Sequence, residues 1–110
     1  MSRKRDGLAE LDEIAQVFSA LAHASRRQIL LVLHIRGDRV TAGEIAKRFS
    51  CSWPTTTRHL RVLEDAGLVT VHRRGRERFY ELEKKKLRGV VGGWLSHFGG
   101  DGTLVREDRG

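Results

Sequence analysis

The chain has little of several residue types that would define its class. It holds one cysteine, Cys51, which excludes an internal disulfide. No apolar run approaches the roughly 20 residues that span a bilayer, which excludes a transmembrane helix and a membrane partner. The basic start, residues 1–7, leads into an acidic helical pattern and not into an apolar signal core. These absences predict a globular protein of the cytoplasm, with room for one domain in 110 residues.

Acidic residues are also scarce relative to basic ones. The chain has 14 Asp and Glu residues and 21 Lys and Arg residues, which gives a formal net charge of +7. The two signs are separated along the chain, because residues 8–23 carry three acidic side chains and no Lys or Arg, whereas residues 67–88 carry eight basic and three acidic ones. This separation indicates a basic face for a polyanion, of which nucleic acid is the commonest.

Two amphipathic helices are predicted in the first third of the chain. Apolar residues spaced three and four apart predict a helix over residues 8–22. Ser25 is expected to cap the next helix, and Gly37-Asp38 is expected to end it. Residues 1–7 are predicted to form a flexible basic arm in front of the first helix.

Two further helices follow, each with its own start signal. Thr41 and Glu44 have the spacing of a capping box, which predicts a short third helix. Ser52 is the next candidate N-cap, and Pro54, the only proline, falls in the first turn, where its missing N–H costs nothing. This fourth helix is predicted to stop at Gly67.

A hairpin and a last helix complete the predicted domain. β-Branched residues predict a strand over residues 68–72, and residues 78–82 read as the return strand after a turn at Arg74-Gly75. A helix with one apolar side begins near Lys84. The fold is therefore predicted to be mainly α with a small β-hairpin (α+β), a winged helix-turn-helix.

Four segments make a family recognisable. They are FSALAHASRRQILLVL (18–33), TAGEIAKRF (41–49), SWPTTTRHLRVLEDAGLV (52–69) and RRGRERFYEL (73–82). Over about residues 8–98 the chain resembles the ArsR-type (arsenic-repressor-like) bacterial transcription regulators. The resemblance implies a DNA-binding and dimerisation domain over 8–98, a flexible tail over 99–110, and a repressor that occupies an operator. The family commonly has Asp-Pro-Thr-Arg where this chain has His23-Ala24-Ser25-Arg26.

The metal ligands of the family's metal sensors are missing. Those proteins carry a Cys-x-Cys pair on the third helix or paired Asp, His and Glu ligands on the last helix. Here the third helix has no cysteine, and the last helix has His97 without a carboxylate spaced to join it. A closed site needs about four such ligands. The chain therefore resembles the metal-independent branch, with no metal or cofactor; an effector or partner protein is left open.

The fourth helix is the predicted recognition helix. At about 100° per residue, its outer side is opposite the stripe of Thr56, Leu60 and Leu63. Arg58 is expected to grip guanine with two hydrogen bonds, and Arg61 to clamp a phosphate. Trp53 has the alternative of packing on the preceding turn, and His59 that of a plain surface histidine. The predicted DNA-binding residues of this helix are Trp53, Pro54, Thr55, Thr57, Arg58, His59 and Arg61.

The hairpin is the predicted wing. It carries Arg73, Arg74, Arg76 and Arg78 around Gly75, and these four arginines are predicted to bind DNA. Arginines at such a tip enter the minor groove or hold flanking phosphates. The alternative is a solvated hairpin tip without a role in binding.

The first and last helices are predicted to form a homodimer. Each has an apolar side that a chain of this length leaves partly uncovered, although an intramolecular core is the alternative. A two-fold dimer would place two recognition helices about 34 Å apart, on an inverted repeat in double-stranded DNA. Close helix approach would explain Gly89, Gly92 and Gly93. The predicted interface residues are Leu11, Phe18, Val91, Trp94, Leu95 and Phe98.

Two other functions compete with a sequence-specific regulator. One is a low-specificity architectural DNA-binding protein, and the other is a redox-responsive regulator that acts through Cys51, which precedes the recognition helix. No enzyme is expected, because the five histidines are scattered and no catalytic pairing follows from their spacing.

Overall fold

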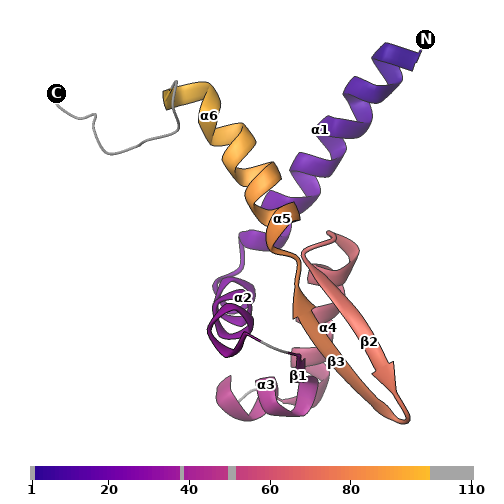
Figure 1. Ribbon diagram of the computed structural model, residues 1–110, viewed down its shortest axis with the longest axis vertical. Helices are drawn as coiled ribbons and strands as arrows, with labels where there is room; N and C mark the ends of the chain where they lie inside the picture. The colour runs from indigo at the N-terminus through magenta and orange to yellow at the C-terminus, as the bar shows by residue number, and fades with distance from the viewer. Residues whose placement is uncertain (1, 38, 50–51, 100–110) are drawn as a thin grey trace, which may run out of the picture.

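The computed structural model describes residues 2–37, 39–49 and 52–99, with side chains from Ala9 onward (Figure 1). It is mainly helical with one small sheet, as predicted. Within the described ranges, no helix combines the length and apolar character needed to cross a membrane. The elements are α1 (Ser2–Leu21), α2 (Ala24–Arg36), β1 (Val40–Thr41), α3 (Ala42–Phe49), α4 (Trp53–Asp65), β2 (Val69–Arg74), β3 (Glu77–Leu82), α5 (Lys84–Leu87), the π-helical turn η1 (Arg88–Gly92) and α6 (Gly93–Gly99).

The two outer helices differ in extent or regularity from the prediction. Helix α1 begins at Ser2, so that residues 2–7, predicted as an arm, are helical. Arg3, Lys4 and Arg5 are good helix formers, so the helix extends backwards through them although Gly7 costs about 1 kcal/mol. The last helix begins at Lys84 as predicted, but five of its residues, Arg88–Gly92, form a π turn. Two of those five are glycines, which favour the regular helix least.

The start of α2 corrects the prediction that Ser25 caps this helix. The N-cap is His23, whose Nδ1 accepts a hydrogen bond from the backbone N–H of Ser25 at 3.3 Å. An imidazole nitrogen thus does what a serine or aspartate oxygen usually does at this position. The end of α2 is as predicted, because Gly37 takes the left-handed conformation (φ 74°) and its N–H bonds to the Leu33 carbonyl.

The helix starts predicted at Thr41 and Ser52 are confirmed. Thr41 N–H donates to Glu44 Oε1 at 2.8 Å, and Glu44 N–H donates back to Thr41 Oγ1 at 3.1 Å, which is a complete capping box. Ser52 Oγ accepts from Thr55 N–H at 3.2 Å, and Pro54 lies in the first turn of α4. Helix α4 is therefore fixed at its N-terminus by its own sequence.

The sheet has a strand that the sequence did not predict. Its order is β1-β3-β2, with both pairs antiparallel. Strand β1 is two residues long, too short for an alternating pattern to show. The hairpin turn lies at Gly75-Arg76 instead of Arg74-Gly75, and Gly75 has φ 63°, which glycine adopts without strain.

One core joins all parts of the helix-turn-helix body to the hairpin. The inner residues of α4, Leu60 and Leu63, have no exposed surface, and Thr56 is 2% exposed. They pack where α2, α3 and the sheet meet. The buried apolar residues of this cluster are Val17, Ala20, Ile29, Leu30, Leu33, Val40, Ala42, Ile45, Leu60, Leu63, Ala66, Leu68, Val69 and Tyr80.

Helices α1 and α6 leave the body as two diverging arms (Figure 1). They meet near their base, where the Phe18 and Trp94 rings are 5.2 Å apart in an edge-to-face arrangement. An ion pair between Lys86 Nζ and Glu13 Oε2, 2.7 Å apart, ties α5 to α1 in the same region. One acidic side chain of α1 is thus used to hold a lysine of the basic segment.

Replacing the two serines tests the corrected capping scheme. We expect Ser52→Ala to lower the free energy of unfolding by about 0.5–2 kcal/mol, because the Thr55 amide loses its acceptor. Ser25→Ala is the matched control and should change it by less than about 0.5 kcal/mol, since the Ser25 side chain caps nothing. Urea denaturation followed by circular dichroism measures both. Equal losses in the two variants would contradict the assignment of His23 as the cap.

Candidate nucleic-acid interface

The first turns of α4 present hydroxyls that differ in their hydrogen bonding. Thr56 is buried, and its hydroxyl donates to the Ser52 carbonyl at 3.0 Å. Thr57 donates to the Trp53 carbonyl at 2.9 Å, so its proton is used within the helix. Thr55 Oγ1 instead accepts from Ser52 Oγ at 2.9 Å and keeps its own proton to donate. Of the two half-buried hydroxyls, Thr55 is therefore the donor and Thr57 the acceptor for a ligand.

The exposed side of α4 contains most of the residues predicted for it. Pro54, Arg58 and Arg61 are exposed, and Trp53 is 58% exposed. The Trp53 ring also lies over Gly43 of α3, since a Cβ built at Gly43 would be 3.5 Å from its Cζ3. Trp53 thus packs on the neighbouring helix and still offers the rest of its ring to a ligand.

His59 is not on this exposed side. Its side chain is buried, with 9% of its surface exposed, and the 4.5 Å distance between ring centroids places it against His23. Its Nδ1 lies 3.3 Å from Arg26 Nη1. Position 59 follows the buried Thr56 by three residues, which brings it onto the inner edge of the helix. The structure therefore corrects both sequence-based placements of His59, on the outer side of the helix and as a plain surface histidine.

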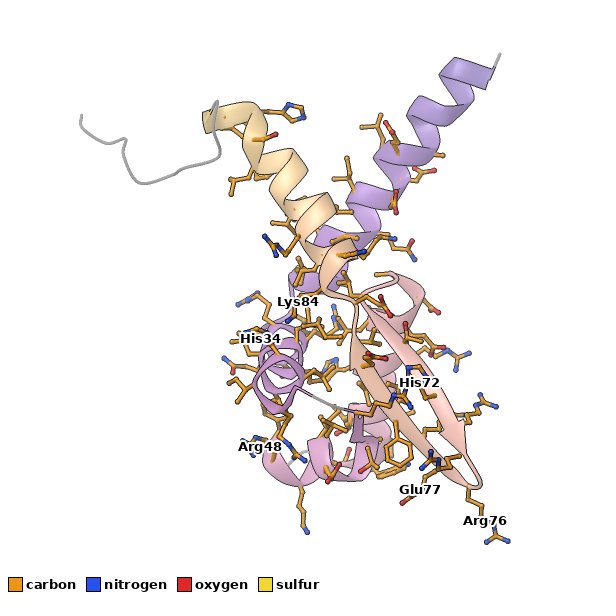
Figure 2. All side chains as sticks on the ribbon, viewed as in Figure 1. His34, Arg48, His72, Arg76, Glu77 and Lys84 are labelled. Atoms are coloured by element: carbon orange, nitrogen blue, oxygen red, sulfur yellow. The ribbon has the colours of Figure 1, made fainter. Side chains whose placement is uncertain are left out.

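The wing places its arginines on both faces of the hairpin. Arg73 is directly opposite Arg78, and Arg74 is opposite Glu77. Like charges directly opposite each other destabilise an antiparallel pair, whereas opposite charges support it. All four arginines are exposed. Arg76 projects from the tip of the hairpin, away from the body (Figure 2).

A groove of about 310 Å³ runs between α4 and the wing. Thr57 and Arg61 line it from α4, and Arg73 and Arg78 line it from the two strands. The strand register explains why the arginines of the wing lie next to α4. Arg73 and Arg78 continue the hairpin face on which Tyr80 is buried beneath this helix. Glu64 and Asp65 line it as well, yet no ion pair within the described residues joins them to the three arginines.

The opposite face of the hairpin holds residues that were not predicted. Arg39, which precedes β1, lines a second hollow of about 810 Å³ together with His72 and Arg74. His72 Nε2 is 2.7 Å from Glu81 Oε1, and Arg39 Nε is 3.9 Å from the same oxygen. Only the short strand β1 brings Arg39 to the sheet, so the missed strand explains the missed residue.

The residues predicted for a dimer interface line the two arms. Phe18, Trp94 and Phe98 form an aromatic row, with 4.9 Å between the Trp94 and Phe98 rings. This row is incompletely covered, since Trp94 is 42% and Phe98 71% exposed. Leu11 is 63% exposed, and Val91 and Leu95 are half-buried.

Two predictions concern metal and redox chemistry. Cys51 lies outside the described residues. Among the residues that the structure describes, no three His, Cys, Asp or Glu side chains gather as they would around a metal ion.

These features define a winged helix-turn-helix protein. A model of a helix-turn-helix domain family matches residues 21–72. The transcriptional repressor SdpR of Bacillus subtilis is 35% identical over 82 residues, which cover 74% of this chain and 88% of that protein. An ArsR-like transcriptional regulator from Rhodococcus sp. RHA1 is 30% identical with a TM-score of 0.70, over 83% of each chain.

A further solved structure covers more of the chain. It is the homodimeric winged helix-turn-helix DNA-binding domain of a possible ArsR-family regulator from Mycobacterium bovis, 27% identical with a TM-score of 0.68 over 94% of this chain and 92% of that one. The chain belongs to the ArsR family of winged helix-turn-helix transcriptional regulators.

Burial of His59 makes stability depend on pH. Burial lowers the pKa of His59 below the ordinary value of 6.5, and the positive charges of His23, Arg26 and Arg58 lower this pKa further. As the pH is lowered through 6.5, His59 of the unfolded chain takes up a proton that the folded chain resists. The free energy of unfolding therefore decreases as the pH is lowered through this range. We expect His59→Gln to flatten the fall between about pH 7.5 and 5.5, measured by urea denaturation.

The exposed His97 supplies the control for this measurement. His97→Gln removes an imidazole from α6 without touching the core and should keep the wild-type pH dependence. A His59→Gln variant with the full wild-type fall would show that another group is responsible.

Proposed function

We propose that the protein is a homodimeric, sequence-specific transcriptional repressor that binds an inverted-repeat operator. The groove between α4 and the wing carries this proposal, because Arg61, Arg73 and Arg78 converge there from two elements of a helix-turn-helix protein. A guanidinium fork matches the geometry of a phosphate, and phosphate contacts fix the register of a protein on the duplex. The relatives named as repressors support the direction of the regulation.

The opposed pair Arg73 and Arg78 supports a polyanionic partner. Two like charges directly across the hairpin repel each other and weaken the wing in the free protein. A phosphate between or beside them would remove this repulsion. A solvated tip without a binding role would not need this pairing.

Specificity is assigned to the outer side of α4. Arg58 is exposed there, and arginine reads guanine O6 and N7 with two hydrogen bonds worth about 1–3 kcal/mol of discrimination. Thr55 has a hydroxyl proton to donate and Thr57 an oxygen that accepts. Trp53 and Pro54 are exposed in the first turn of the same helix. This set suits base edges, whereas an architectural protein would need only the phosphate contacts.

The two arms supply the dimer. Burial of a large apolar side chain against a partner gains about 1.5–3 kcal/mol, so Leu11, Trp94 and Phe98 together favour association. A Cβ built at Gly89, Gly92 or Gly93 meets nothing within 4 Å in this chain. The space beside these glycines therefore admits a second helix at close range. The homodimeric relative of the same fold supports this arrangement.

The protein is further proposed to act in the cytoplasm, where a bacterial DNA-binding regulator meets its operator, and to act without a metal, from the ligand inventory of its own sequence. The third helix offers Glu44 alone among metal-binding side chains, and α6 offers His97 alone. DNA affinity is therefore expected to be the same with a chelator and with added zinc, measured by gel shift. Release of the DNA by zinc would overturn this part of the proposal.

Two sets of arginines are expected to act differently in DNA binding. Arg58→Ala should relax the base preference at one operator position and cost about 1–3 kcal/mol on the specific site. The double variant Arg74→Ala with Arg76→Ala should weaken binding to all sequences and flatten its salt dependence, because fewer counterions are released. Footprinting first identifies the operator, and competition with random duplex then measures both effects.

A double variant of exposed lysines on α5, Lys84→Ala with Lys85→Ala, is the matched control and should retain the salt slope. An Arg58→Ala variant that weakens every sequence equally would contradict base reading. A specificity ratio below about 10³ for the wild type would favour the architectural protein.

The dimer is tested by placing a charge on the aromatic row. Phe98→Glu should shift the protein toward a monomer in sedimentation at micromolar concentration and weaken binding to the full operator. Ile35→Glu is the matched control, because Ile35 is 72% and Phe98 71% exposed, but Ile35 lies on α2. A wild-type protein that sediments as a monomer would refute the homodimer.

A further inference from the structure

A second groove, of about 690 Å³, lies between α2 and the start of α5. Figure 2 shows His34 on α2 and Lys84 at the start of α5 on this side of the molecule, remote from Arg76 at the tip of the wing. The groove belongs to none of the surfaces assigned to DNA or to the dimer. Its lining residues are Leu21, Arg27, Gln28, Leu30, Leu31, His34, Leu82, Lys84, Leu87 and Arg88.

The floor of this groove is leucine from four elements. Leu30 is 5% exposed and belongs to the core, whereas Leu31 beside it is 53% exposed. Leu21, Leu82 and Leu87 are half-buried and pack against the same core. Apolar surface that is contiguous and hollowed is typical of a ligand site, whereas single exposed apolar residues are ordinary on a protein surface.

The rim of the groove is cationic. Arg27, Lys84 and Arg88 line it with His34, and none of its lining residues is a carboxylate. Within the described part of the chain, the ion pairs involve none of these three cations. The Arg27 side chain is held in place by a hydrogen bond to the end of α1, since its Nη1 donates to the Leu21 carbonyl at 2.8 Å. The positive charge at the rim is thus not balanced by the residues that line the groove.

We propose that this groove binds a monomeric anionic amphiphile, a carboxylate with an unbranched apolar chain. The leucine floor would cover the chain, and Lys84 or Arg88 would pair with the carboxylate at the rim. The volume lies within the range of about 300–1,000 Å³ that small-molecule sites occupy. Complementarity of charge selects an anion over a neutral or cationic molecule of equal apolar length.

The position of the groove brings such a ligand into contact with both the helix-turn-helix body and the start of the last helix. Its occupant touches α2 of the helix-turn-helix body and α5, which leads into the arm formed by η1 and α6. A ligand with different affinities for two placements of this arm would shift the population between them. This effector role rests on the proposed function, whereas binding itself does not.

Dodecanoate, kept below its micelle concentration, is the probe for isothermal titration with the full chain. We expect one molecule per chain, and no binding of dodecyltrimethylammonium, which has the same chain and the opposite charge. Lys84→Glu with Arg88→Glu should weaken dodecanoate binding by about tenfold or more, because it reverses two charges at the rim. Lys85→Glu, a neighbouring exposed lysine that does not line the groove, is the matched control.

The floor is tested by Leu31→Glu against Ile35→Glu, two exposed apolar positions one turn apart on α2, of which only Leu31 lines the groove. Loss of dodecanoate binding in the first variant alone supports the site. Absence of wild-type binding, equal binding of both detergents, or dissociation of a dimer by Leu31→Glu would overturn the proposal, the last because a second copy would then cover the groove. Operator affinity with and without dodecanoate is measured separately, so that failure of DNA binding leaves the binding result intact.

Discussion

The burial of one face of α4 is the constraint on which the rest of the structure depends. Leu60 and Leu63 have no exposed surface, and Thr56 has almost none, so the helix cannot rotate about its axis without exposing them. Exposing either leucine would cost about 1.5–3 kcal/mol. Because the inner face is fixed, the outer face is fixed with it. Arg58 and Trp53 are held on the surface by residues that never meet a ligand.

The same helix shows how polar groups are divided between structure and recognition. Ser52 caps the helix, Thr56 bonds back to the Ser52 carbonyl, and Thr57 bonds back to the Trp53 carbonyl. Such bonds satisfy the two hydroxyl donors within the helix, but they do not offset the poor helix propensity of threonine. After these bonds, Thr57 keeps an oxygen that accepts, and Thr55 keeps a hydroxyl proton to donate.

Much of the fold was predictable because local signals and tertiary packing agree. The capping box of Thr41 and Glu44, the Ser52 cap, and the left-handed glycines after α2 and α4, Gly37 and Gly67, each have a physical cause within a few residues. Strand β1 was not predictable, because its two residues become a strand only when Tyr80 and Phe79 of β3 lie beside them. The local sequence pattern of two residues does not show that a partner strand will lie beside them.

The candidate site divides in the same way. Exposure of Arg58 and Arg61 follows from helical periodicity, and the four arginines of the wing follow from composition around Gly75. Burial of His59 does not follow, since it depends on Arg26 and His23 at a corner 33 and 36 residues away in sequence. The groove between α4 and the wing likewise depends on the hairpin register, which places Arg73 and Arg78 on the helix side.

The corner between α1 and α2 has a consequence for the geometry of a dimer. Arg26 Nε donates to the Ala20 carbonyl at 2.7 Å, near the end of α1. Nη1 of the same guanidinium lies 3.3 Å from Nδ1 of His59 on α4. One side chain thus fixes the direction in which the arm leaves the body relative to the recognition helix. In a two-fold assembly built from these arms, this direction would decide how far apart the two recognition helices lie. The tolerated spacing of two half-sites would then depend on a residue whose guanidinium bonds to the end of α1 and lies against His59.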